Sequence, residues 1–156
     1  MSIIAIDPGS EQSAFVIYDK GKIIEFGKYK NKDMLFIVGA RKVESHLAIE
    51  MVACYGMPVG KTIFDTCVWI GRFIEAWGRD YTQIYRKEVT LCLCNSVRAK
   101  DPNVRQAIID RYPSTGGGKI PQIGIKAKPG PLYGISEDVW AALGVAICFS
   151  EIKELS

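Results

Sequence analysis

The chain has 156 residues, a mass of 17.3 kDa and a formal net charge of +3, with 48% hydrophobic and 24% charged residues. This length fits one domain, residues 1–156, and excludes a two-lobed kinase-type ATPase, a TIM barrel and a multidomain enzyme. The composition supports a sizeable core and is that of a globular protein, which excludes wholesale disorder.

The N-terminal half predicts strands around a hairpin, followed by one helix. Four strands are expected, at residues 2–6, 13–18, 22–28 and 46–52. Asp7-Pro8-Gly9-Ser10 predicts a turn after the first strand, and Asp19-Lys20-Gly21 predicts the hairpin turn. A helix is expected over residues 31–44.

The C-terminal half predicts mainly helices. A wide apolar face makes residues 62–77 the clearest helix. Further helices are expected over 101–112, where Asp101 would be the N-cap before Pro102, and over 136–153, with Ser136 as the cap. Residues 82–85 predict a short strand, and residues 91–94 fit either a strand or a helix. Strands first, then helices alternating with strands, indicate a single α/β domain.

The positive charge is concentrated in one part of the chain. Between Arg98 and Lys128 there are seven basic and two acidic residues, whereas the rest of the chain has 13 basic and 15 acidic ones. This segment also contains Gly116, Gly117 and Gly118, which indicate a flexible loop. A flexible basic segment suits a polyanion such as nucleic acid, because Lys and Arg neutralise phosphates. A solvated surface loop is the alternative interpretation.

Acidic residues stand at the ends of three predicted elements. Asp7 closes the first strand, Glu50 lies in an otherwise apolar strand, and Glu137 and Asp138 fall in the first turn of the last helix. A carboxylate in an apolar run is unfavourable unless it is paired or binds a cation. If these groups converge, Mg²⁺ would relieve their repulsion, and two ions could clamp the oxygens of a phosphodiester. Alternatively, Asp7 shapes a turn, and Glu137 and Asp138 favour the helix dipole.

Three motifs carry these acidic residues in order: IDPGS at 6–10, followed by the hairpin, AIEMVA at 48–53, and EDVWAALGVAI at 137–147. This arrangement resembles the RuvC family of Holliday junction resolvases over the length of the chain. Short phage-encoded relatives are the most similar, through NVRQAIIDRY, KPGPLYGI and VWAALGVA. The resemblance implies an RNase H-like α/β fold, with a central mixed five-stranded sheet flanked by helices. It also implies a homodimeric endonuclease that depends on Mg²⁺, for which Mn²⁺ can substitute.

The resemblance implies a role for individual residues. Asp7, Glu50 and Asp138 match the family's metal ligands, and the family implies two ions in each site. Ala141 stands where the family usually has a second aspartate, and Glu137 could supply the missing oxygen. A further expected catalytic residue is Lys100, which resembles a basic residue near the scissile phosphate in that family and would stabilise charge on the phosphoryl oxygens.

DNA contacts are expected from a loop and from the basic residues. Tyr55 and Met57 lie in the loop after Glu50, where relatives insert groups into the junction. The expected basic contacts are Lys61, Arg98, Lys100, Arg105, Lys119, Lys126 and Lys128. Lys61 belongs to the segment Gly56–Thr62, which resembles a P-loop but has three residues between its glycines instead of four, so no nucleotide cofactor is expected.

The predicted function is hydrolysis of phosphodiesters in branched DNA, with water as the nucleophile. Two alternatives stay open: a protein that binds junctions with little or no cutting, because of Ala141, and an RNase H-like nuclease that acts on RNA. Paired cuts in a two-fold junction call for a homodimer. The apolar helix around Trp69, Phe73 and Trp77 is expected to contribute to the dimer interface.

The chain carries no signal for a membrane or a secretory route. No apolar run reaches the roughly 18 residues that a membrane span needs, and the start MSIIAIDPGS lacks the features of a signal peptide. We therefore expect a cytoplasmic protein, in the host cell if the gene is carried by a phage. The five cysteines form no CxxC pair and are expected to be reduced, packed thiols.

Overall fold

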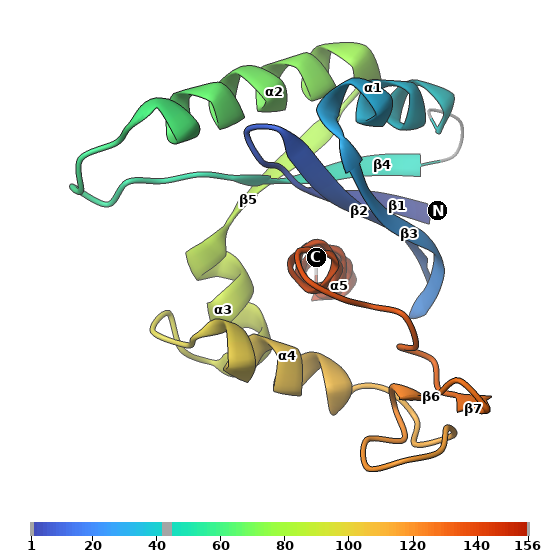
Figure 1. Ribbon diagram of the computed structural model, residues 1–156. Helices are drawn as coiled ribbons and strands as arrows, with labels where there is room; N and C mark the ends of the chain where they lie inside the picture. Colours follow the sequence, from blue (N-terminus) through green and yellow to red (C-terminus); the bar gives the residue numbers. More distant parts are fainter. Residues whose placement is uncertain (1, 42–44, 156) are drawn as a thin grey trace.

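The computed structural model describes residues 2–41 and 45–155. A five-stranded sheet in the order β3-β2-β1-β4-β5 forms its centre (Figure 1). Its strands are β1 (Ser2–Asp7), β2 (Gln12–Asp19), β3 (Lys22–Lys30), β4 (Ser45–Met51) and β5 (Tyr81–Tyr85). Strands β1, β2 and β3 pair antiparallel, whereas β1, β4 and β5 pair parallel. The sheet is therefore mixed, as predicted.

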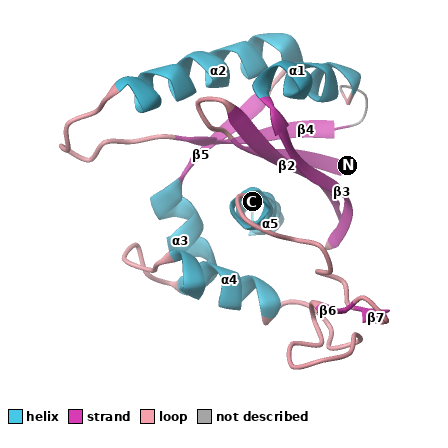
Figure 2. Cartoon of the chain, in the orientation of Figure 1, coloured by secondary structure: helices cyan, strands magenta, loops and turns pink. Residues whose placement is uncertain are grey.

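Helices cover both faces of this sheet. They are α1 (Asn31–Ala40), α2 (Lys61–Trp77), α3 (Arg86–Cys94), α4 (Asp101–Ile109) and α5 (Val139–Leu155). Helices α1 and α2 lie on one face; α5 lies against the other, and α3 and α4 pack beyond it (Figure 2). The predicted α/β class, with a sheet flanked by helices, is confirmed. No helix in the described part of the chain has the length and apolar character of a membrane span.

Alternating side chains of the strands build two cores. Ile4 and Ile6 of β1 point toward α1 and α2, whereas Ile3 and Ala5 belong to the core around α5. This alternation follows from the two-residue period of a strand and explains why residues 3–6 of β1 are all apolar. At Gly144 of α5, a Cβ atom would lie 3.3 Å from Val89 Cγ1, so a small residue lets α5 approach α3 closely.

The glycine-rich part of the basic segment is not the flexible loop that the composition predicted. It contains a short hairpin of β6 (Gly124–Ile125) and β7 (Lys128–Pro129). The Gly116 N–H donates to the Pro121 carbonyl (2.8 Å), and a Cβ atom on Gly116 would lie 2.7 Å from the backbone of Gly124. The glycines therefore serve close packing of backbone on backbone.

Several predicted helix ends shift. The first helix ends at Ala40, and the predicted extension includes residues 42–44, which lie outside the described residues. Residues 91–94 are helical, and in α4 the N-cap position is Lys100, one residue before the predicted Asp101.

The last helix begins at Val139. Glu137 and Asp138 therefore precede the helix, and the prediction that they form its first turn is wrong. Ser136 is therefore not its cap. The physical reason is the backbone of Glu137, which has a φ of 47° in the left-handed region that a right-handed helix cannot include.

The prediction that the apolar residues of α2 contribute to a dimer interface is also wrong in part. The side chains of Phe73 and Trp77 are fully buried in the core between α2 and the sheet. Trp69 is half-buried, and the Arg72 guanidinium carbon lies 4.2 Å from its ring centre. The wide apolar face that suggested a second chain is thus mostly consumed by the chain's own core.

This assignment predicts unequal effects of two substitutions in α2. Phe73→Ala should lower the free energy of unfolding by about 3–5 kcal/mol, because it leaves a cavity in the core. Phe64→Ala on the same helix should change it by less than about 1 kcal/mol, because Phe64 is 60% exposed. Urea unfolding followed by circular dichroism measures both, and equal losses would contradict the orientation of α2.

Candidate functional site

A cavity of about 800 Å³ opens at the ends of β1 and β4. Five carboxylate side chains of the described residues line it: those of the predicted ligands Asp7, Glu50, Glu137 and Asp138, and that of Asp101. β1 and β4 are parallel neighbours with Ile6 opposite Ile49, so the next residues along, Asp7 and Glu50, lie side by side. The sheet register therefore brings together two acidic residues that are 43 positions apart in the chain.

The Asp7 and Glu50 carboxyl groups are hydrogen-bonded to each other. Burial is the largest cause that raises the pKa of Asp7, and the contact with Glu50 raises this pKa further, to about 9. The charge of Asp138 acts in the same direction, whereas Arg86 lowers the pKa of Asp7. Without a cation, the Asp7 carboxyl group therefore holds a proton at neutral pH.

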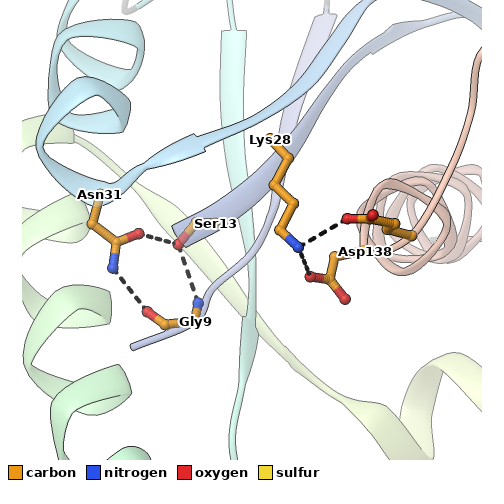
Figure 3. A network of polar contacts seen from close by, with 6 residues as sticks. Gly9, Ser13, Lys28, Asn31 and Asp138 are labelled. Atoms are coloured by element: carbon orange, nitrogen blue, oxygen red, sulfur yellow. Dashed lines mark hydrogen bonds and ion pairs between the residues drawn. The ribbon is translucent and has the colours of Figure 1, made fainter. Parts of the chain in front are cut away.

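Lys28 of β3 forms ion pairs with the two carboxylates that precede α5, those of Glu137 and Asp138. Its Nζ lies 2.9 Å from Asp138 Oδ2 and 3.1 Å from Glu137 Oε2 (Figure 3). The hydrogen bond to Asp138 is the largest cause that raises the pKa of Lys28, followed by the one to Glu137. The left-handed backbone of Glu137 places both acids within reach of this lysine.

The donor chemistry of the cavity fits a hard divalent cation in part. Carboxylate oxygens are the ligands that Mg²⁺ prefers, and the raised pKa of Asp7 beside Glu50 marks a place where positive charge is favourable. Among residues 2–41 and 45–155, however, no group of three or more His, Cys, Asp or Glu side chains is arranged to hold a metal ion. Asp138 is held by Lys28, and Ala141 lines the cavity without an oxygen to offer. The four-residue ligand set stays a prediction.

A buried polar network fixes the turn that follows Asp7 (Figure 3). Ser13 Oγ donates to Asn31 Oδ1 (2.6 Å), Asn31 Nδ2 donates to the Gly9 carbonyl (2.9 Å), and the Gly9 N–H donates to Ser13 Oγ (3.1 Å). Ser13 and Asn31 are buried, so these bonds are made away from water. A Cβ atom on Gly9 would lie 2.3 Å from the Gln12 carbonyl oxygen, which explains the glycine of the IDPGS motif.

The expected DNA-contacting residues fall in two places. Arg105 and Tyr55 line the cavity, and Lys100 is exposed directly beside Asp101 at its edge. In the loop after β4, Met57 is 70% exposed, and the Lys87 ammonium lies 3.8 Å from the Tyr55 ring centre.

The other basic residues lie outside the cavity lining. Lys61 pairs with Asp65 (2.6 Å), and Arg98 is exposed in the loop between α3 and α4. Lys119, Lys126 and Lys128 are exposed around the β6–β7 hairpin, which lies beyond the end of α4 that is distant from α3 (Figure 1). Their contact with DNA stays a prediction.

Four residues of the site were missed by the sequence reasoning: Ser13, Lys28, Asn31 and Arg86. Lys28 and Arg86 look like ordinary surface charges in a strand and after a strand, and only the fold shows what they face. Ser13 and Asn31 had a weak signal, since a polar residue opens an apolar strand and another opens a helix.

Two solved structures match this fold over nearly its whole length. Thermus thermophilus RuvC matches with a TM-score of 0.67 and 15% identity, over 99% of this chain and 96% of that chain. T. thermophilus RuvC in complex with a Holliday junction substrate matches with a TM-score of 0.63 and 15% identity, over 100% and 96%. No protein-family model and no curated protein matches the sequence. The predicted RuvC-like fold is therefore confirmed.

The raised pKa of Asp7 predicts a pH dependence of stability in metal-free buffer. Between pH 3.8 and about 9, Asp7 is protonated in the folded chain and ionised in the unfolded chain, so its contribution to stability falls as the pH rises. The Asp7→Asn variant has no carboxyl group to ionise at this position. Its free energy of unfolding should therefore rise relative to that of the wild type as the pH rises, by up to roughly 1 kcal/mol per pH unit. Chemical unfolding with EDTA at pH 5, 7 and 9 measures the difference. A difference that does not change with pH would contradict the raised pKa of Asp7 in the folded chain.

Proposed function

We propose that this chain is a divalent-metal-dependent endonuclease that cuts branched DNA, with four-way junctions as its substrate. The observation that carries the proposal is the partly buried Asp7–Glu50 pair in a cavity at the ends of two parallel strands. The fold supports it, because a RuvC of this fold was solved in complex with a Holliday junction substrate. The motif resemblance favours an enzyme of the phage-encoded type.

Asp7 and Glu50 would hold the first metal ion with their adjacent carboxylates. Asp138 would complete the site after it separates from Lys28, and Glu137 would contribute through the same step. Bound Mg²⁺ would supply a lowered pKa for a water nucleophile and positive charge for the oxygens of the phosphodiester. A second ion would need further oxygens from water or from DNA, because Ala141 offers none.

The remaining residues would bind and orient the DNA. Arg105 and Tyr55, in the cavity, and Lys100, at its edge, would meet the strand next to the cut. Lys119, Lys126 and Lys128 would neutralise phosphates of a neighbouring arm. Met57 is exposed in a loop where it could wedge between bases at the branch point.

Two active sites are needed to cut both strands of a two-fold junction, so we infer a homodimer. The buried Phe73 and Trp77 are not available for its interface. Phe64 and Val68, each 60% exposed and four residues apart on the outer side of α2, are the apolar side chains of this helix that a partner could cover.

A junction-binding protein without cleavage is the second candidate, and two observations favour it. Ala141 lines the cavity where the family usually has an aspartate, and Lys28 neutralises the acids that remain beside it. Such a protein would bind junctions through its basic residues and leave them uncut in Mg²⁺.

We expect wild-type protein to nick a synthetic four-way junction in Mg²⁺ or Mn²⁺. Asp7→Asn and Glu50→Gln should each reduce the cleavage rate by roughly 100-fold or more, because each removes a charged oxygen ligand from the metal. Denaturing gels of end-labelled junctions measure the rate. Asp33→Asn on exposed α1 makes the same charge change outside the cavity and should leave the rate unchanged.

The same assay separates the alternatives. Tight binding of the junction without a cut in either metal would support the binding protein and overturn the nuclease. Faster cleavage of an RNA–DNA hybrid than of a junction, a flap or a linear duplex would replace DNA with RNA as the substrate.

Lys28 should compete with the metal. Lys28→Gln removes the ammonium from Asp138 and Glu137, so the dissociation constant for Mn²⁺ should fall several-fold, because the local potential becomes more negative. Isothermal titration calorimetry measures this constant, with Lys22→Gln at the other end of β3 as the control. Unchanged or weaker Mn²⁺ binding in Lys28→Gln would show that Lys28 is not in competition with the ion.

A further inference from the structure

Arg86 brings positive charge to the same sheet edge as the acid pair. It is the first residue of α3 and follows β5 directly. Tyr85, the last residue of β5, is paired with Met51, the last residue of β4. Arg86 therefore lies at the same edge of the sheet as Glu50, which directly precedes Met51. Arg86 lines the cavity, and its charge acts on Asp7.

One side of the Arg86 guanidinium is held and the other is unused. Nη2 forms an ion pair with the Asp101 carboxylate at the start of α4. Nη1 is buried and has no hydrogen-bond partner among the described residues. A buried charged donor without an acceptor is costly, so an orphan of this kind in a cavity wall can be satisfied by an acceptor from a ligand.

The two partners of the Arg86–Asp101 ion pair differ in their exposure to solvent, as expected if Asp101 only positions Arg86. The Asp101 side chain is 90% exposed, whereas the Arg86 side chain is only 31% exposed. A surface pair of this kind adds little stability by itself, but it restricts the long arginine side chain to one orientation. The energy of the contact therefore does not explain why the buried Nη1 is tolerated.

A second guanidinium shares this cavity. The guanidinium carbon of Arg105 lies 4.8 Å from the ring centre of Trp140, and both residues line the cavity. The cavity thus combines carboxylates from β1, β4 and the segment before α5 with guanidiniums from α3 and α4. A bound phosphodiester is a ligand that needs both kinds of charge, because its oxygens can be shared by a cation on the carboxylates and by arginine donors.

We propose that Arg86 binds a backbone phosphate of the DNA strand in the cavity through Nη1, with Asp101 as the positioning residue that holds the guanidinium through Nη2. This inference rests on the proposed function, since it needs DNA as the ligand, and it adds a phosphate contact from α3. As charge gathers on the phosphoryl oxygens during hydrolysis, the fixed guanidinium strengthens its contact without reorganising.

The test is a double-mutant cycle, in which substitutions in the protein are combined with neutralisation of single phosphates in the junction. Four-way junctions carry one neutral methylphosphonate at successive positions around the cut, and fluorescence anisotropy in EDTA measures their binding without cleavage. For wild type, one position should weaken binding roughly tenfold. Arg86→Gln should bind the unmodified junction roughly tenfold more weakly and lose nothing further at that position.

Three further variants isolate the cause. Arg41→Gln removes an arginine that is likewise ion-paired, with Glu25, outside the cavity lining, and it should keep the wild-type profile. Asp101→Asn keeps Arg86 but releases it, and it should weaken the coupling. If Arg86→Gln does not fold, Arg86→Lys replaces it, because an ammonium held by Asp101 leaves the Nη1 position empty and the coupling still falls.

The outcomes distinguish the two proposals. If wild type binds and cuts the junction but no phosphate couples to Arg86, the phosphate contact is overturned and the nuclease stands. If coupling appears at one phosphate although Mg²⁺ produces no cut, Arg86 binds DNA in a protein that does not cleave. If wild type binds no branched DNA at all, both proposals fall.

Discussion

Two acidic side chains in contact, Asp7 and Glu50, set the terms for everything around them. Burial of this pair is tolerable only with a proton or a cation between the carboxyl groups, since two ionised groups at this distance repel each other. The contact follows from the parallel pairing of β1 with β4, so the central sheet and the candidate site depend on the same backbone register. A shift of one residue in that register would turn one acid to the opposite face.

The chain itself supplies cations to the rest of the cavity. Lys28 neutralises Asp138 and Glu137, while Arg86 and Arg105 bring guanidiniums from the helices on the same side. The charged side chains of this cavity can pair either with one another or with the charges of a ligand. Binding of a metal and of a phosphodiester would replace ion pairs within the chain by contacts with the ligand. This balance is the physical argument for a ligand that carries both a hard cation and a phosphate.

Two supports outside the cavity keep its wall in place. The buried ring of Gly9, Ser13 and Asn31 ties the turn after β1 to the start of α1. On the other face, Gly144 lets α5, which begins directly after Asp138, approach α3 and α4 closely. Neither support would bind a ligand.

The sequence by itself determined the α/β class and the order of the acidic motifs, because apolar periodicity and turn residues act over short distances. The mixed five-stranded sheet was expected only from the resemblance to the RuvC family. It also identified Asp7, Glu50 and Asp138 as the acids that the fold gathers at one cavity. Only the tertiary structure decided that Lys28 holds Asp138, that Arg86 faces Asp7, and that Phe73 and Trp77 are internal. These outcomes depend on which side chains meet across separate elements. Local pattern carries no such information, because a lysine in a strand reads the same whether it faces water or a carboxylate.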